Sequence, residues 1–177
     1  MKRILPFLTA ALIVSALPLR AEVTDSAAGG FTVKTVTPIA APPRRVYDVV
    51  VREFPKWWDA GHSFSGKSYN LSMSDQVGGG FHEKLGDEGF VRHLSVVYAD
   101  PGKLLRLTGA LGPLQEMAVT GTLSLTFDET EAGTSLVAVY RVGGYYPPGL
   151  DTVAGAVDGV ISEQFKRLKD WIESDGN

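Results

Sequence analysis

The sequence has no cysteine, only three histidines and no run of basic residues. Without cysteine the chain cannot form a disulfide, so its stability must come from packing. A lipid anchor of the bacterial lipobox type is excluded for the same reason. Basic residues number 17 against 20 acidic ones, with no basic stripe, so nucleic acid is not an expected partner.

Long hydrophobic runs are also scarce, and the longest spans residues 4–19, after Met1-Lys-Arg and before Arg20-Ala-Glu22. A basic start, a short apolar core and a small residue at the boundary predict a Sec-type signal peptide over residues 1–21, cleaved after Ala21. An uncleaved anchor is the alternative, but the run holds two prolines and is short for a span of roughly 20 residues. We therefore expect an exported, periplasmic protein with no stable membrane span after cleavage. Cleavage leaves 14 basic against 20 acidic residues, a net charge of −6.

The remaining chain has the length of one ordinary domain. Polar and small residues over 22–30 predict a flexible leader, and residues 31–174 form a single domain. Alternating and β-branched segments predict strands at 31–39, 69–74, 81–85, 90–99, 103–109, 118–128 and 134–143. A helix is expected over 43–54. A longer C-terminal helix carries one apolar stripe that includes Val153, Val157, Val160, Ile161, Phe165, Leu168 and Ile172.

The hairpin over residues 77–97 places charged residues on an apolar face. If Asp87-Glu88 is a two-residue turn, Glu83 lies opposite Arg92, on the face that also carries Phe81, Leu85, Phe90 and Leu94. Burying either charge alone would cost several kcal/mol. The pair is therefore either a polar anchor inside a ligand cavity or a cross-strand ion pair at the rim or on the solvent face.

The last two strands form a second hairpin, in which pairing Phe127 with Thr134 puts Gly121 opposite Tyr140. A glycine opposite a large ring leaves space for that ring over the sheet. We therefore expect Tyr140 to point into the cavity, where its hydroxyl needs a partner.

The order of elements is more specific than any single motif. The motifs are Trp57-Trp58, Val77-Gly-Gly-Gly-Phe81, the Asp100-Pro-Gly turn, Gly133-Thr134 and the helix end Phe165-Lys-Arg-Leu-Lys169. Over about residues 31–174 the chain resembles the START-like or SRPBCC superfamily, which includes polyketide cyclases. The resemblance implies an α+β helix-grip fold, in which a curved antiparallel sheet of about six to seven strands grips the C-terminal helix. It also implies a cavity for apolar or amphipathic small molecules, but no single chemistry.

We expect an exported protein that binds a small apolar or amphipathic ligand between sheet and helix. One alternative is a cyclase-like or hydrolase-like enzyme using Glu83, Arg92 and Tyr140; another is a protein-interaction module that docks through exposed Trp57-Trp58. The expected ligand-binding residues are Trp57, Trp58, Phe81, Glu83, Arg92, Leu94, Tyr140, Tyr145 and Val157.

No cofactor is expected. The same hairpin register sets His82 against His93, but the spacing contains no metal motif, and no metal is expected.

Overall fold

Apolar and polar side chains alternate along β2 (Gly30–Ile39), and every second residue from Phe31 to Ile39 is buried. The same period recurs in the later strands, so one face of each strand lines a core. In the computed structural model, which describes residues 20–174, these strands form one sheet. The other strands are β1 (Arg20–Ala27), β3 (Leu71–Met73), β4 (Gly80–Leu85), β5 (Gly89–Asp100), β6 (Leu104–Gly109), β7 (Ala118–Thr130) and β8 (Gly133–Tyr145).

The sheet is antiparallel throughout, in the order β1-β2-β8-β7-β6-β5-β4-β3. It has eight strands rather than six to seven, because residues expected to be a flexible leader belong to β1, which pairs with β2. The expected signal peptide lies outside the described residues except for its last two.

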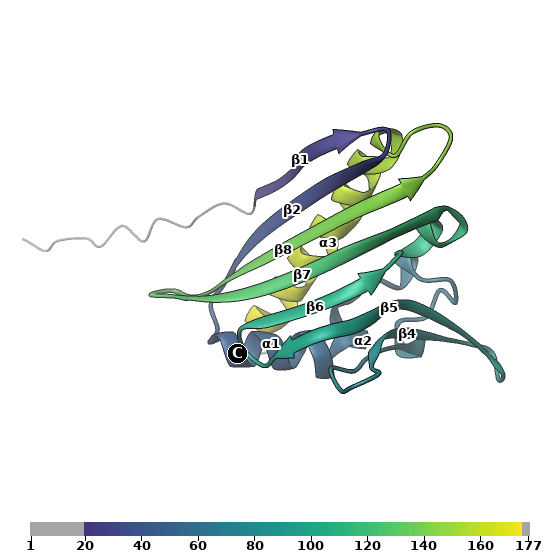
Figure 1. Cartoon of the computed structure of the whole chain (residues 1–177). Helices are drawn as coiled ribbons and strands as arrows, with labels where there is room; N and C mark the ends of the chain where they lie inside the picture. Colours follow the sequence, from purple (N-terminus) through teal and green to yellow (C-terminus); the bar gives the residue numbers. More distant parts are fainter. Residues whose placement is uncertain (1–19, 175–177) are drawn as a thin grey trace, which may run out of the picture.

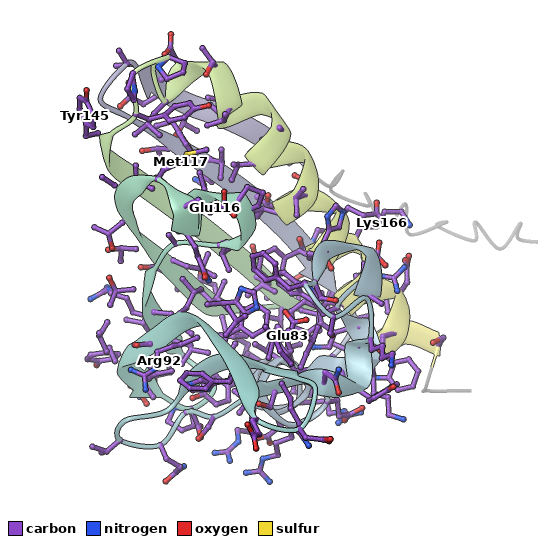
Figure 2. All side chains as sticks on the ribbon, turned by 90° about the vertical axis from the view of Figure 1, so that its right-hand side faces the viewer. Glu83, Arg92, Glu116, Met117, Tyr145 and Lys166 are labelled. Carbon is purple, nitrogen blue, oxygen red and sulfur yellow. The ribbon has the colours of Figure 1, made fainter. Side chains whose placement is uncertain are left out.

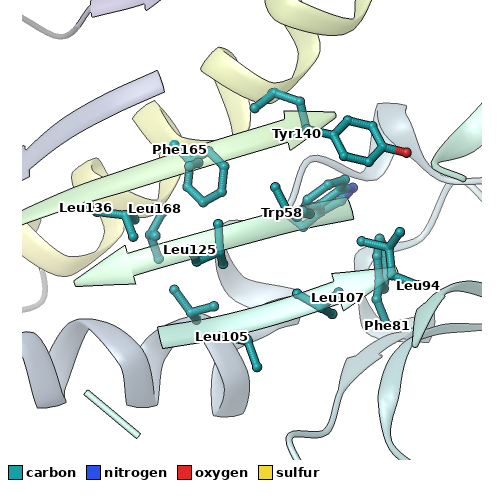
Figure 3. Close-up of a cluster of buried hydrophobic side chains, with 14 of the residues drawn as sticks. Trp58, Phe81, Leu94, Leu105, Leu107, Leu125, Leu136, Tyr140, Phe165 and Leu168 are labelled. Carbon is teal, nitrogen blue, oxygen red and sulfur yellow. The ribbon is translucent and has the colours of Figure 1, made fainter. Parts of the chain in front are cut away.

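The long helix α3 (Asp151–Ser174) crosses one face of the sheet (Figure 1). Its second half buries Ile161, Phe165, Leu168 and Ile172, which recur at steps of three and four. Figure 3 shows Phe165 and Leu168 gathered with Leu125 and Leu136 of the sheet. The first half is packed less closely, and Val153, Val157 and Val160 stay partly exposed.

Two short helices, α1 (Pro43–Arg52) and α2 (Phe54–Trp57), lie at one end of the sheet. Pro43, at the start of α1, has no N–H that would lack a partner in the first turn, and Val46, Val49 and Val50 face the core. Three single turns complete the fold: η1 (Ala60–His62), η2 (Ser68–Asn70) and η3 (Gly112–Glu116). Within residues 20–174, the structure has no helix with the length and apolar character needed to cross a bilayer.

Candidate functional site

A cavity of about 420 Å³ lies under the first half of α3. Four parts of the chain line it: the loop after α2, the β4–β5 hairpin, the η3 segment and α3. Its wall is mostly apolar and consists of Trp58, Gly61, His62, Ser63, Phe64, Phe81, His93, Leu111, Gly112, Pro113, Leu114, Met117, Val153, Ala156, Val157, Val160 and Ile161. A mostly apolar hollow of this size with few polar groups is typical of a small-molecule site.

Glu83 is buried beside this cavity rather than exposed in it. Its carboxylate accepts hydrogen bonds from the backbone N–H groups of Phe64, at 3.1 Å, and of Ser65, and its Oε2 lies 3.0 Å from His93 Nε2. Burial by itself would raise the pKa of Glu83, but the hydrogen bonds from these three residues outweigh it and lower the pKa below its ordinary 4.5. Glu83 is therefore an ionised carboxylate with three hydrogen-bond partners, and it holds the cavity loop against β4.

His93 is the partner that the sequence reasoning missed. Its ring stacks on Phe81, with centroids 4.2 Å apart, and on Phe64, at 5.8 Å, and it forms part of the cavity wall. Burial lowers the pKa of His93 below its ordinary 6.5, although Glu83 acts in the opposite direction. At neutral pH the pair is a carboxylate hydrogen-bonded to a neutral imidazole.

The predicted pairing of Glu83 with Arg92 is wrong. The turn has three residues, with Leu85 paired to Gly89 and Gly86 at a φ of 59°, so Glu83 pairs with Val91. A β-bulge then leaves His93 without a partner on β4 and restores the predicted pairing of Phe81 with Leu94. Because of the bulge, His93 and Leu94 are consecutive yet both buried.

Arg92 is consequently exposed, and it pairs with His82 across the hairpin. Figure 2 shows Glu83 among the interior side chains and Arg92 away from it. Arg92 and Leu94 instead line a second pocket of about 290 Å³. The expected facing of His82 and His93 does not occur, and within residues 20–174 no cluster of three histidine or acidic side chains is placed to hold a metal.

Tyr140 is buried behind the cavity, not in its wall. The strand register differs from the predicted one by two residues, so Leu123 rather than Gly121 pairs with Tyr140. The ring nevertheless lies over Gly121, where an added Cβ would come within 2.5 Å of it. The hydroxyl donates to the carbonyl of Gly109 and accepts from the N–H of Leu111, each at 3.2 Å, so it anchors the η3 segment.

The remaining expected ligand-binding residues divide into two groups. Trp58, Phe81 and Val157 line the cavity. Trp57 is buried in the core, where its indole N–H donates to the carbonyl of Val49 at 3.3 Å. Tyr145 is 71% exposed and lies at the end of the molecule opposite Arg92 (Figure 2).

Sequence reasoning also missed Phe64 and the η3 segment as parts of the wall. Phe64 is half exposed at the rim, and Leu111 and Met117 come from the apolar loop between the strands expected at 103–109 and 118–128. The available signal was the apolar character of that loop, which is unusual for a segment in solvent.

Comparisons with known proteins support the fold. No family model matches the sequence, and no curated protein does either. An uncharacterized protein from Rhizobium leguminosarum has a similar structure, with a TM-score of 0.60 at 16% identity over 89% of this chain and 99% of that one. Protein MLL2253 from Mesorhizobium loti has a TM-score of 0.58 at 18% identity, over 81% of this chain and 97% of the other.

A third similar structure is the di-domain ARO/CYC StfQ from the steffimycin biosynthetic pathway. Its TM-score is 0.59 at 14% identity, over 84% of this chain and 52% of that chain. Together with the eight-stranded sheet and the long C-terminal helix, these likenesses show the helix-grip fold. At such identities they show the fold alone.

Proposed function

We propose that this helix-grip protein binds a small apolar or amphipathic molecule in the cavity under α3, and that it does so after export to the periplasm. The observation that carries the proposal is the cavity itself. Its wall is mostly apolar, and no side chain of the described residues fills its 420 Å³. Val153, Val157 and Val160 remain partly exposed above it, so a ligand would cover apolar surface that the protein leaves uncovered.

The few polar groups around the cavity support a binding role. Ser63 Oγ donates to the carbonyl of Ala60 at 2.8 Å, and the Glu83 carboxylate is occupied by three donors. These groups hold the loop in place and leave the ligand to be recognised mainly by shape and apolar contact.

A cyclase-like enzyme is the second candidate, favoured by the buried Glu83–His93 pair at the cavity wall. A carboxylate that orients an imidazole is a common arrangement for proton transfer. The residues differ from those expected, because Arg92 lies outside the cavity and the Tyr140 hydroxyl has partners. The interaction module lacks its docking surface, because Trp57 and Trp58 are both buried.

Native mass spectrometry of the protein purified from its own host tests the proposal. We expect a chain beginning at Glu22 that carries an added small-molecule mass, lost on denaturation. Val157→Trp, which fills the cavity, should abolish the added mass with little change in melting temperature. The control is Val97→Trp, at a residue 56% exposed and outside the wall, which should keep it. The binding proposal fails if the wild type carries no added mass or if Val157→Trp keeps it.

A further inference from the structure

We propose that the amino terminus created at Glu22 by removal of the signal peptide forms an ion pair with the carboxylate of Asp158 on α3. This pair ties β1, at the edge of the sheet, to the half of α3 that covers the cavity. It depends on the proposed export, because cleavage after Ala21 is what creates a charged amino group at Glu22.

Asp158 has a buried carboxylate oxygen without a partner. Among residues 20–174, no group donates a hydrogen bond to its Oδ1. Burial raises the pKa of Asp158 above its ordinary 3.8, and the negative charge of Glu22 raises it further. An unpaired carboxylate in this position costs free energy, and a cation beside it would offset that cost.

Contacts between α3 and β2 fix the position of Asp158 along the strands. Ser162 Oγ lies 3.3 Å from Thr35 Oγ1. Further along both elements, Lys169 Nζ donates to the carbonyl of Pro38 at 2.7 Å, so the helix and the strand run in the same direction. Asp158 precedes Ser162 by one turn, which is about 6 Å along the helix. That rise equals about two residues of a strand.

The cleavage site lies at the same height on β1. Asp158 is level with Val33, two residues before Thr35, and Val33 pairs with Val23 of β1. Glu22 is the neighbour of Val23, and the effect of its charge on the pKa of Asp158 agrees with this closeness. Hydrolysis of the bond between residues 21 and 22 by a signal peptidase therefore leaves an ammonium group beside the carboxylate.

The charges around Asp158 offer it no other cation. Residues 142–165, which include the half of α3 over the cavity, contain no lysine, arginine or histidine. Lys34 pairs with Glu22, but it alternates with buried residues of β2 and therefore points away from α3. The amino group at the start of a chain has no such constraint and can turn to either face.

Carbon-13 shifts of Glu22, followed against pH, test the pair in the chain purified from its own host, after its first residue has been sequenced. We expect the amino group to titrate about one pH unit above its ordinary pKa of about 7.8. In Asp158→Asn its pKa should fall toward that ordinary value. Glu163→Gln removes an exposed acid of the same helix and should keep the raised pKa.

The wild type alone provides a second measurement, without a variant that must fold. The carboxyl carbon of Asp158 should show a small additional step at the pH at which the Glu22 amino group loses its proton, because the two charges act on each other. The carboxyl carbon of Glu163 should show no such step.

The outcomes separate the ion pair from the other proposals. A chain that begins at Glu22 and whose amino group has the same pKa in the wild type and in Asp158→Asn overturns the pair, as does the absence of the additional step. Export and the cavity function then stand. A chain that keeps residues 1–21 overturns the pair and the export proposal together, and a chain that begins at any other residue overturns the pair and the predicted cleavage site.

Discussion

His93 and Glu83 show how single residues at this site depend on each other. Glu83 is held ionised by three donors, and His93 is held neutral by its burial. For each group, protons bind the unfolded chain better than the folded one, because both folded pKa values lie below the ordinary values of 4.5 and 6.5. The contribution of His93 to the free energy of unfolding is therefore fully present above pH 6.5. It is lost as the pH falls through the folded pKa of His93.

We expect the free energy of unfolding to fall between about pH 7.5 and pH 5, and to fall less in His93→Phe than in the wild type. Glu83 and Gln115 lie within hydrogen-bond distance of the His93 ring, and the charge of His82 on β4 acts on it to lower its pKa. Urea denaturation at both pH values measures the difference. His62→Phe, at an exposed histidine, should keep the wild-type dependence. The same dependence in His93→Phe would show that this ring is not held neutral by the fold.

The residues of the site could be predicted only in part. Phe81, Glu83 and Leu94 were correctly placed on one face of the hairpin, because alternation along a strand is a local property. Whether Glu83 faced a cavity or solvent was left open, and the structure buries it. The burial of His93 could not be predicted, because it depends on a β-bulge in β5. The bulge brings His93 to Glu83 and has no local sequence signature. Arg92 was placed on the wrong face, because the true register of the hairpin differs by one residue at Glu83.

The loop after α2 is the element on which the cavity depends. Few regular hydrogen bonds hold it; instead Glu83 of β4 accepts from Phe64 and Ser65, and the Gln164 side chain of α3 accepts from the Asp59 N–H at 2.8 Å. The loop is thus fixed from the sheet on one side and from the helix on the other, and its aromatic residues are positioned as part of the wall.

Glu83→Gln should loosen this loop, because an amide oxygen cannot accept from all three donors. We expect a loss of about 1 to 3 kcal/mol in the free energy of unfolding. Hydrogen exchange at the Phe64 and Ser65 amides should be faster by about tenfold. Glu88→Gln, at the exposed hairpin turn, is the matched control and should change neither value. Unchanged exchange at the two amides in Glu83→Gln would mean that the carboxylate does not hold the loop.

Most helices and strands were predictable, because the period of their apolar residues indicates the type of element and the turn residues indicate where it ends. The β7–β8 pairing was off by two residues, because Thr130 pairs with Gly133 across a shorter turn than expected. A shift of two keeps each side chain on its face, so Tyr140 still covers Gly121. β1 was missed because its polar, small residues read as a linker; its place at the sheet edge comes from pairing with β2.

The whole molecule combines a well-packed end with an unfilled one. The second half of α3 buries its apolar stripe against the sheet, while the first half lies over the cavity. The sequence predicted a cavity between sheet and helix with Val157 at its wall, but only the arrangement of η3, the loop after α2 and the hairpin shows where packing stops. The fold was predictable from element order, but of the side chains expected at the cavity only Trp58, Phe81 and Val157 reach it.

Isotope-filtered nuclear Overhauser spectra with bound 2-methoxynaphthalene test the binding claim most directly. The account predicts contacts from the probe to the methyl groups of Val157 and Ile161 in the cavity wall and none to Val97 on the exposed side of β5. An absence of bound probe, or contacts to Val97 without contacts to Val157 and Ile161, would contradict it.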